Sequence, residues 1–236
     1  MTTIAPPIML RISGVQTLEV AKFVAKNGFG IAFNFDWKSP KFIEPSKANQ
    51  IKQNISKETY TCGIFKDPTD KEITKCLNEI DIDQIQLNGN ENKDRVQFIK
   101  LWFSKYPLKA QLNPGQNFPT IYKRERKYER EIIKSITISC KKDIEKISNY
   151  KDIGVGFLLD TSEAENIDWN IFNFNDPPGI VSGKFNKENI KSAIKSKKYF
   201  IDISKGLENE MNELSIEKIK SLFEFIRSDE METARF

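Results

Sequence analysis

The chain has 236 residues and 39% hydrophobic content, enough for one large domain, and its formal net charge of +4, with lysines and glutamates interleaved, disfavours a nucleic-acid partner. It contains no histidine, which excludes histidine-based catalytic triads and histidine-ligated zinc. Three scattered cysteines, the lack of an apolar run of about 18 residues and the lack of a signal-peptide pattern predict a cytoplasmic protein without a membrane segment.

Short apolar segments alternate with amphipathic segments along most of the chain. The predicted strands are 8–12, 31–35, 60–65, 82–87, 131–139, 155–159, 180–181 and 199–203. The predicted helices begin near Thr17, Pro45, Pro68, Lys93, Lys142, Asn186 and Ser215. This alternation requires a parallel sheet, and eight strands favour a closed barrel over an open sheet. We therefore expect an α/β fold, a single (β/α)8 TIM barrel over residues 1–236.

One segment, 107–130, interrupts this alternation between the fourth helix and the fifth strand. It holds three prolines and then the charged run 122–130, so we expect an inserted excursion. The run alternates basic residues with tyrosines, which leaves two readings open: a solvated helix, or a contact surface for RNA or an acidic partner. Residues 228–236 are expected to form a loose tail.

Two glycine-bearing turns follow the last two predicted strands. Together with the helix between these strands, they form a predicted βαβ unit over residues 179–208. Bare backbone amides at such turns can bind a phosphate, and the predicted phosphate-binding residues are Ser182, Gly183, Lys184, Ser204, Lys205 and Gly206. The alternative is that Gly183 and Gly206 only close tight turns.

In a barrel, the residues where strands end surround one mouth, and several polar side chains stand at these positions. Asp160 directly follows four apolar residues, so desolvation would raise its pKa and suit it to general-acid work. A structural ion pair of Asp160 with Arg11 or Lys134 is the open alternative. The expected ligand-binding residues at this mouth are Arg11, Lys41, Gln86 and Asn88.

Several segments match, in order, the motifs of one enzyme family. They are Arg11–Gly14, Phe35–Lys41, Ile85–Glu91, Leu158–Asp160, Ile167–Trp169, Val181–Asn189 and Asp202–Glu208. On these segments the chain resembles the phosphoribosylanthranilate isomerases of tryptophan biosynthesis. The resemblance implies an intramolecular oxidoreductase, an aldose–ketose isomerase that needs no metal or cofactor. It also implies a phosphoribosyl-type ligand and a monomer or homodimer.

The resemblance places Asp160 where the family has its general acid and Ser13 where it has its proton-abstracting cysteine. Serine does not ionise near neutral pH without a base to help it, whereas a thiol partly does. Lys41 stands in place of an arginine, and Asn88 in place of a histidine. These departures predict a phosphate-binding barrel with weak or lost isomerase activity. The alternatives are an authentic isomerase, or a non-enzymatic interaction protein that uses the segment 122–130.

Overall fold

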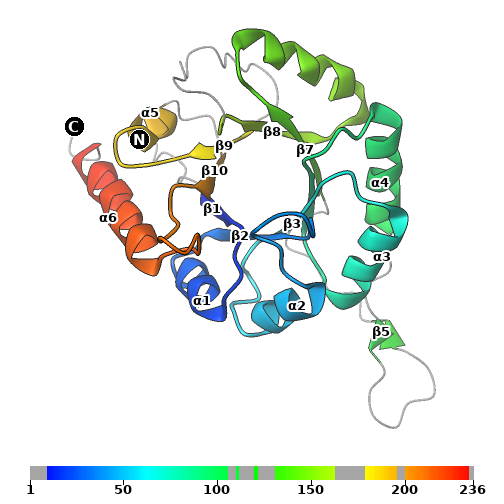
Figure 1. Cartoon of the computed structure of the whole chain (residues 1–236), viewed down its shortest axis with the longest axis horizontal. Coiled ribbons are helices and arrows are strands. Elements are labelled where there is room, and N and C mark those ends of the chain that lie inside the picture. Colours follow the sequence, from blue (N-terminus) through cyan, green and yellow to red (C-terminus); the bar gives the residue numbers. More distant parts are fainter. Residues whose placement is uncertain are drawn as a thin grey trace, which may run out of the picture.

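The computed structural model describes residues 10–105, 110–111, 120–121, 131–162, 179–195 and 200–233. Its barrel strands are β1 (Leu10–Ser13), β2 (Gly30–Asn34), β3 (Thr61–Phe65), β4 (Gln84–Leu87), β7 (Glu131–Thr137), β8 (Gly156–Asp160), β9 (Ile180–Lys184) and β10 (Phe200–Lys205). They close in the order β1-β10-β9-β8-β7-β4-β3-β2, with every neighbouring pair parallel. Figure 1 shows this barrel inside a ring of helices, so the predicted (β/α)8 fold is confirmed.

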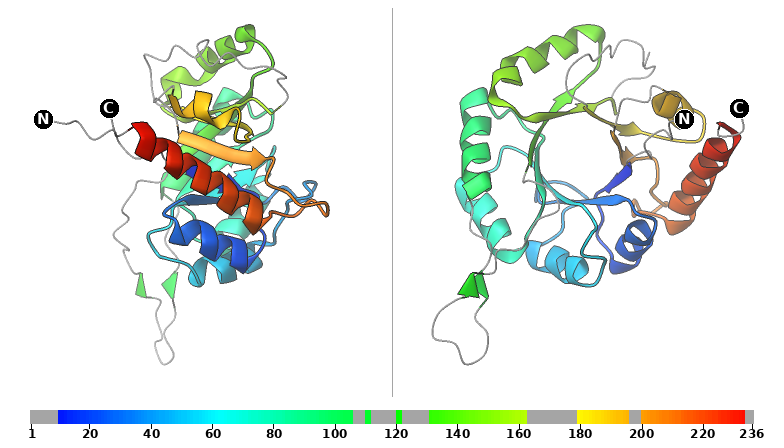
Figure 2. Two further views of the ribbon diagram at one scale, coloured as in Figure 1. Left: turned by 90° about the vertical axis from the view of Figure 1, so that its left-hand side faces the viewer. Right: turned by 180° about the vertical axis from the view of Figure 1, so that it is seen from behind.

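The helices follow the predicted starts closely. They are α1 (Leu18–Lys26), α2 (Pro45–Gln53), α3 (Asp70–Glu79), α4 (Lys93–Lys105), α5 (Ile190–Lys195) and α6 (Ile216–Thr233). Side chains cap several of them: Thr17 accepts from the Val20 amide, and Thr69 forms a capping box with Glu72. Figure 2 shows the helices around the strands from the side and from behind.

The predicted helix near residues 142–148 is instead a long 3₁₀ helix, η1 (Lys141–Ile153). Its apolar residues recur every three positions, at Ile144, Ile147, Tyr150 and Ile153, and all four pack against the core. A 3₁₀ helix has three residues per turn, so this spacing puts the four side chains in one row. Gly154 ends the helix in the left-handed region, with φ of +60°.

The inserted segment contains one described element, a pair of two-residue antiparallel strands, β5 (Ala110–Gln111) and β6 (Thr120–Ile121). Figures 1 and 2 place it outside the ring of helices. The charged run 122–130 and the Ile167–Trp169 segment lie outside the described residues. Helix α6 continues to Thr233, beyond the expected start of the tail. Within the described residues, no helix combines the length and the apolar character needed to cross a bilayer.

The core has an outer and an inner part. The large outer cluster fills the space between strands and helices, while small clusters inside the barrel contain Ala32, Cys62 and Ile64 on one side and Ile133, Leu158 and Ile180 on the other. Four polar side chains are also buried in the barrel interior: Arg11, Gln84, Gln86 and Asp202. Buried polar groups need hydrogen-bond partners, and the partners of this polar layer include residues of the site.

Candidate active site

Four neighbouring strands carry polar residues in one row. Arg11 on β1 is in register with Asp202 on β10, and Asp202 with Ser182 on β9. Ser182 is in register with Asp160 on β8. Because side chains on parallel strands in register lie side by side, the row spans one half of the barrel mouth. It brings together residues that lie up to 191 positions apart in sequence.

Asp202 is the centre of this row. Its side chain is 1% exposed and accepts hydrogen bonds on both oxygens. Oδ1 accepts from Arg11 Nε at 2.8 Å and from Ser13 Oγ at 2.6 Å, while Oδ2 accepts from Ser182 Oγ at 2.9 Å. Asp202 therefore links three strands through one buried carboxylate. Asp202 fell within the matched segment Asp202–Glu208 but was given no role at the site, although a lone charge within the apolar run Tyr199–Ile203 could have marked it.

Arg11 was expected to bind ligand, but its side chain has 0% exposure and its donors are taken by neighbours. It donates to Gln84 at 2.7 Å and also to Gln86, in addition to its ion pair with Asp202. Burial opposes its charge, but the Asp202 carboxylate outweighs burial and raises the pKa of Arg11. Gln86 extends this hydrogen-bond network, because its side-chain amide donates to Asn88 Oδ1 at 2.8 Å. Arg11 thus lies below the mouth, where it holds the side chains of Asp202, Gln84 and Gln86 in place.

Asp160 lies half-buried at the end of β8. Its carboxylate accepts a hydrogen bond from the Ser162 amide at 3.0 Å. The alternative sequence reading paired Asp160 with Arg11 or Lys134, but Arg11 pairs with Asp202, and Lys134 pairs with Glu91 at 2.8 Å. Within the described part of the chain, Asp160 therefore has no cation bound to it, in contrast to Asp202.

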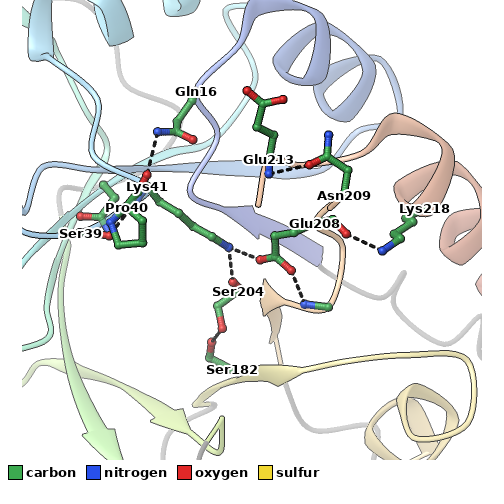
Figure 3. A network of polar contacts seen from close by, with 12 residues as sticks. Gln16, Ser39, Pro40, Lys41, Ser182, Ser204, Glu208, Asn209, Glu213 and Lys218 are labelled. Carbon is green, nitrogen blue, oxygen red and sulfur yellow. Dashed lines mark hydrogen bonds and ion pairs between the residues drawn. The ribbon is translucent and has the colours of Figure 1, made fainter. Parts of the chain in front are cut away.

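Lys41 reaches from the loop after β2, over the end of β1, to the loop after β10 (Figure 3). Its ammonium donates to the Ser204 carbonyl at 2.7 Å and forms an ion pair with Glu208. The other Glu208 oxygen accepts from the Gly206 amide at 2.7 Å. Burial alone would raise the pKa of Glu208, but the Lys41 ammonium outweighs it and lowers that pKa. Glu208 is a second residue that the sequence analysis did not select.

Gly14 makes room for the Lys41 side chain. Its φ is +79°, in the left-handed region, and a Cβ at this position would collide with the Lys41 Cδ. Only glycine meets both requirements at low cost. The residue after Ser13 is therefore glycine because the stem of Lys41 passes directly over it.

The two predicted phosphate-binding turns lie side by side, since Lys184 at the end of β9 is in register with Lys205 at the end of β10. A Cβ at Gly183 would lie 2.6 Å from Thr161 Oγ1, and one at Gly206 would lie 2.9 Å from the Phe185 carbonyl oxygen. The tight packing by itself thus requires glycine at both positions. The Ser182 and Ser204 hydroxyl oxygens lie 3.1 Å apart, and both lysines are exposed. The Gly206 amide is already bonded to Glu208.

Neither Cys62 nor Cys140 lies in this row. Cys62 is fully buried inside the barrel, and burial raises the pKa of its thiol to about 12, although the nearby Arg11 lowers it in part. Cys140 is exposed after β7, at the N-terminal end of η1.

Asn88, which was expected to bind ligand, lies exposed after β4.

The family model and the curated relatives both match one enzyme family. The chain matches the family model for N-(5'-phosphoribosyl)anthranilate (PRA) isomerase over residues 10–129 and 115–225. The N-(5'-phosphoribosyl)anthranilate isomerase of Rhizobium etli is 24% identical over 233 residues, which cover 93% of this chain and 94% of the relative. That of Brucella canis is 25% identical over 231 residues, with 92% and 93% covered.

Solved structures share the fold. The phosphoribosylanthranilate isomerase from Thermotoga maritima superposes with a TM-score of 0.72 at 22% identity, covering 94% of this chain and 100% of its own. A second such isomerase was solved in complex with reduced 1-(o-carboxyphenylamino)-1-deoxyribulose 5-phosphate. It gives a TM-score of 0.68 at 23% identity, with 91% and 95% covered.

Proposed function

Because the chain belongs to the phosphoribosylanthranilate isomerase family, we propose that it is an authentic isomerase of tryptophan biosynthesis. It would rearrange N-(5'-phosphoribosyl)anthranilate, an aminoaldose, into the corresponding aminoketose. The family model and relatives matched along nearly their whole length support this reading over the expectation of weak or lost activity. That expectation rested on single residues, and no finding among the described residues or the relatives supports it.

The observation that carries the proposal is the contrast between two carboxylates in one row. Asp202 is buried and bonded to Arg11, whereas Asp160 is half-buried at the rim without a cation bound to it in the described part of the chain. Asp160 is therefore the carboxyl group of this row that can reach a ligand at the mouth. We assign Asp160 the role of the general acid that protonates the ribose ring oxygen and opens the ring.

The ligand would lie across the mouth, with its phosphate at the turns after β9 and β10. Those turns present Ser182, Gly183, Lys184, Ser204, Lys205 and Gly206. One relative was crystallised with a phosphorylated reduced product bound, which supports a phosphoribosyl ligand for this chain as well. Lys41, whose ammonium is held at the β10 loop by the Ser204 carbonyl and Glu208, would contact the anionic ligand there.

The test is turnover of N-(5'-phosphoribosyl)anthranilate, followed by the loss of substrate fluorescence. The expected results are activity in the unaltered chain and a loss of about 10²–10⁴-fold in kcat for Asp160→Asn, the usual contribution of a general acid. Asp152→Asn is the matched control, because Asp152 is an exposed carboxylate on η1 whose recorded ion pair, with Lys93, is also exposed. An inactive unaltered chain, or full activity of Asp160→Asn, would refute the proposal.

A further inference from the structure

Proton abstraction needs a group that the sequence does not supply at the expected place. Ser13 occupies the position of the family's cysteine, and a serine hydroxyl is a weak base unless a partner accepts its proton. Cys62 cannot substitute, because it is buried and its pKa is raised to about 12. The question is therefore which group in contact with Ser13 can take a proton.

The Ser13 hydroxyl has one carboxylate partner in the described structure. Its Oγ donates to Asp202 Oδ1 at 2.6 Å, a short distance typical of a hydroxyl bonded to an ionised carboxylate. Ser13 is 4% exposed and Asp202 is 1% exposed, so the bond is shielded from water. Such shielding strengthens a hydrogen bond and fixes its direction.

Asp202 is held so that it faces Ser13. Arg11 binds the same oxygen at 2.8 Å, and Ser182 binds the other oxygen at 2.9 Å. Arg11 is in register with Asp202, and Ser13 lies two residues further toward the carboxyl end of β1, so Ser13 lies nearer the mouth than Asp202. Asp202 can therefore act on the ligand only through Ser13.

We propose that Ser13 and Asp202 together replace the cysteine, with Ser13 Oγ accepting the substrate proton as Asp202 Oδ1 accepts the proton of Ser13. This inference rests on the proposed isomerase function. Ring opening leaves an iminium group, and the C–H bond on the adjacent carbon then breaks. Its electron pair forms a C=C bond, the iminium π pair moves to nitrogen, and a neutral enolamine results.

The other protons of the catalytic cycle are also accounted for. After this step, Ser13 carries the substrate proton and Asp202 is a neutral carboxylic acid. The enolamine tautomerises to the aminoketose, in which its hydroxyl loses a proton and the neighbouring carbon gains one. Ser13 then gives its proton to solvent at the mouth and takes back the proton of Asp202, and solvent reprotonates Asp160, which had given one to the ring oxygen. The cycle consumes no co-reactant.

The decisive experiment is Asp202→Asn made twice, once in the unaltered chain and once together with Ser13→Cys. A thiolate is a base in its own right, so the Ser13→Cys chain should not need Asp202 for proton abstraction. We expect Asp202→Asn to lower kcat by about 10²–10⁴-fold in the unaltered chain and by less than about 10-fold beside Ser13→Cys. A purely structural role for Asp202 would lower both by the same factor, and that outcome overturns the inference.

A second variant covers the case in which Asp202→Asn fails to fold. Ser13→Ala leaves the contacts of Asp202 with Arg11 and Ser182 in place and should still lower kcat by about 10²–10⁴-fold. Full activity of Ser13→Ala overturns the inference while leaving the isomerase assignment intact. An unaltered chain without turnover refutes the proposed function itself, and the inference falls with it.

Discussion

Replacing Glu208 by glutamine tests the ion pair that joins the loops after β2 and β10. The ion pair with Lys41 is only 15% exposed on each side, and the same carboxylate accepts from the Gly206 amide. A hydrogen bond to a charged group contributes about 1.5–3 kcal/mol, and glutamine has one oxygen with which to keep one of the two. We expect a loss of about 2 kcal/mol in the free energy of unfolding, and a fall of about 4–8 °C in Tm for a chain of this size.

The lowered pKa of Glu208 determines how the stability lost in Glu208→Gln changes with pH. The pKa of Glu208 is lowered in the folded state, so its contribution is fully present above the unfolded value of about 4.3 and disappears as the pH falls through the folded value. The assay is denaturant unfolding of the unaltered chain and Glu208→Gln from pH 7 down to pH 3.5. Glu210→Gln, an exposed change in the same loop, should unfold like the unaltered chain at every pH. Equal stability at pH 7, or a difference that grows towards low pH, would contradict the reasoning.

Three further predictions concern single positions. Arg11→Met leaves the buried Asp202 carboxylate without its cation and should cost about 3–5 kcal/mol in urea unfolding, so an undiminished midpoint would refute the buried pair. Gly14→Ala adds backbone strain and a collision with Lys41, and should lower stability by about 1–3 kcal/mol; a gain in Tm would show that this turn is not as described. In the native protein at pH 8, iodoacetamide should label Cys140, which is exposed, and leave Cys62 unmodified; rapid modification of Cys62 would contradict its burial.

The fold was predictable because a closed barrel imposes a pattern on local sequence. Each strand is buried on both faces, so it reads as an apolar run, and each helix needs one apolar face and a cap. Residues such as Thr17, Thr69 and Asn186 mark helix starts by local chemistry alone. The exception was η1, where the spacing of Ile144, Ile147 and Ile153 fits three residues per turn better than 3.6.

The sequence predicts where in the barrel the candidate site lies, but it does not predict which side chains contact one another there. Strand ends must meet at one mouth, so Asp160 and the turns after β9 and β10 were selected from the alternation of elements, and Ser13 from the family resemblance. Which side chains touch depends on register and barrel closure, and no local pattern carries that information. Arg11 was therefore expected at the ligand, whereas closure places it beneath the mouth with Asp202. Glu208 was missed for the same reason, because its partner Lys41 is 167 residues away.

The expectation of lost activity came from reading Ser13, Lys41 and Asn88 one residue at a time, and Ser13 was the departure that bore on proton abstraction. A buried arginine inside the barrel requires a buried carboxylate, and Asp202 fills that requirement. The same carboxylate then lies 2.6 Å from the Ser13 hydroxyl, so the residue that neutralises Arg11 also stands where a proton acceptor is needed. If this dual role is real, exchanging cysteine for serine at position 13 costs the chain little, because the partner that serine needs was already required for folding. Activity of the unaltered chain that depends on Asp202, and loses that dependence with Ser13→Cys, is the signature of this arrangement.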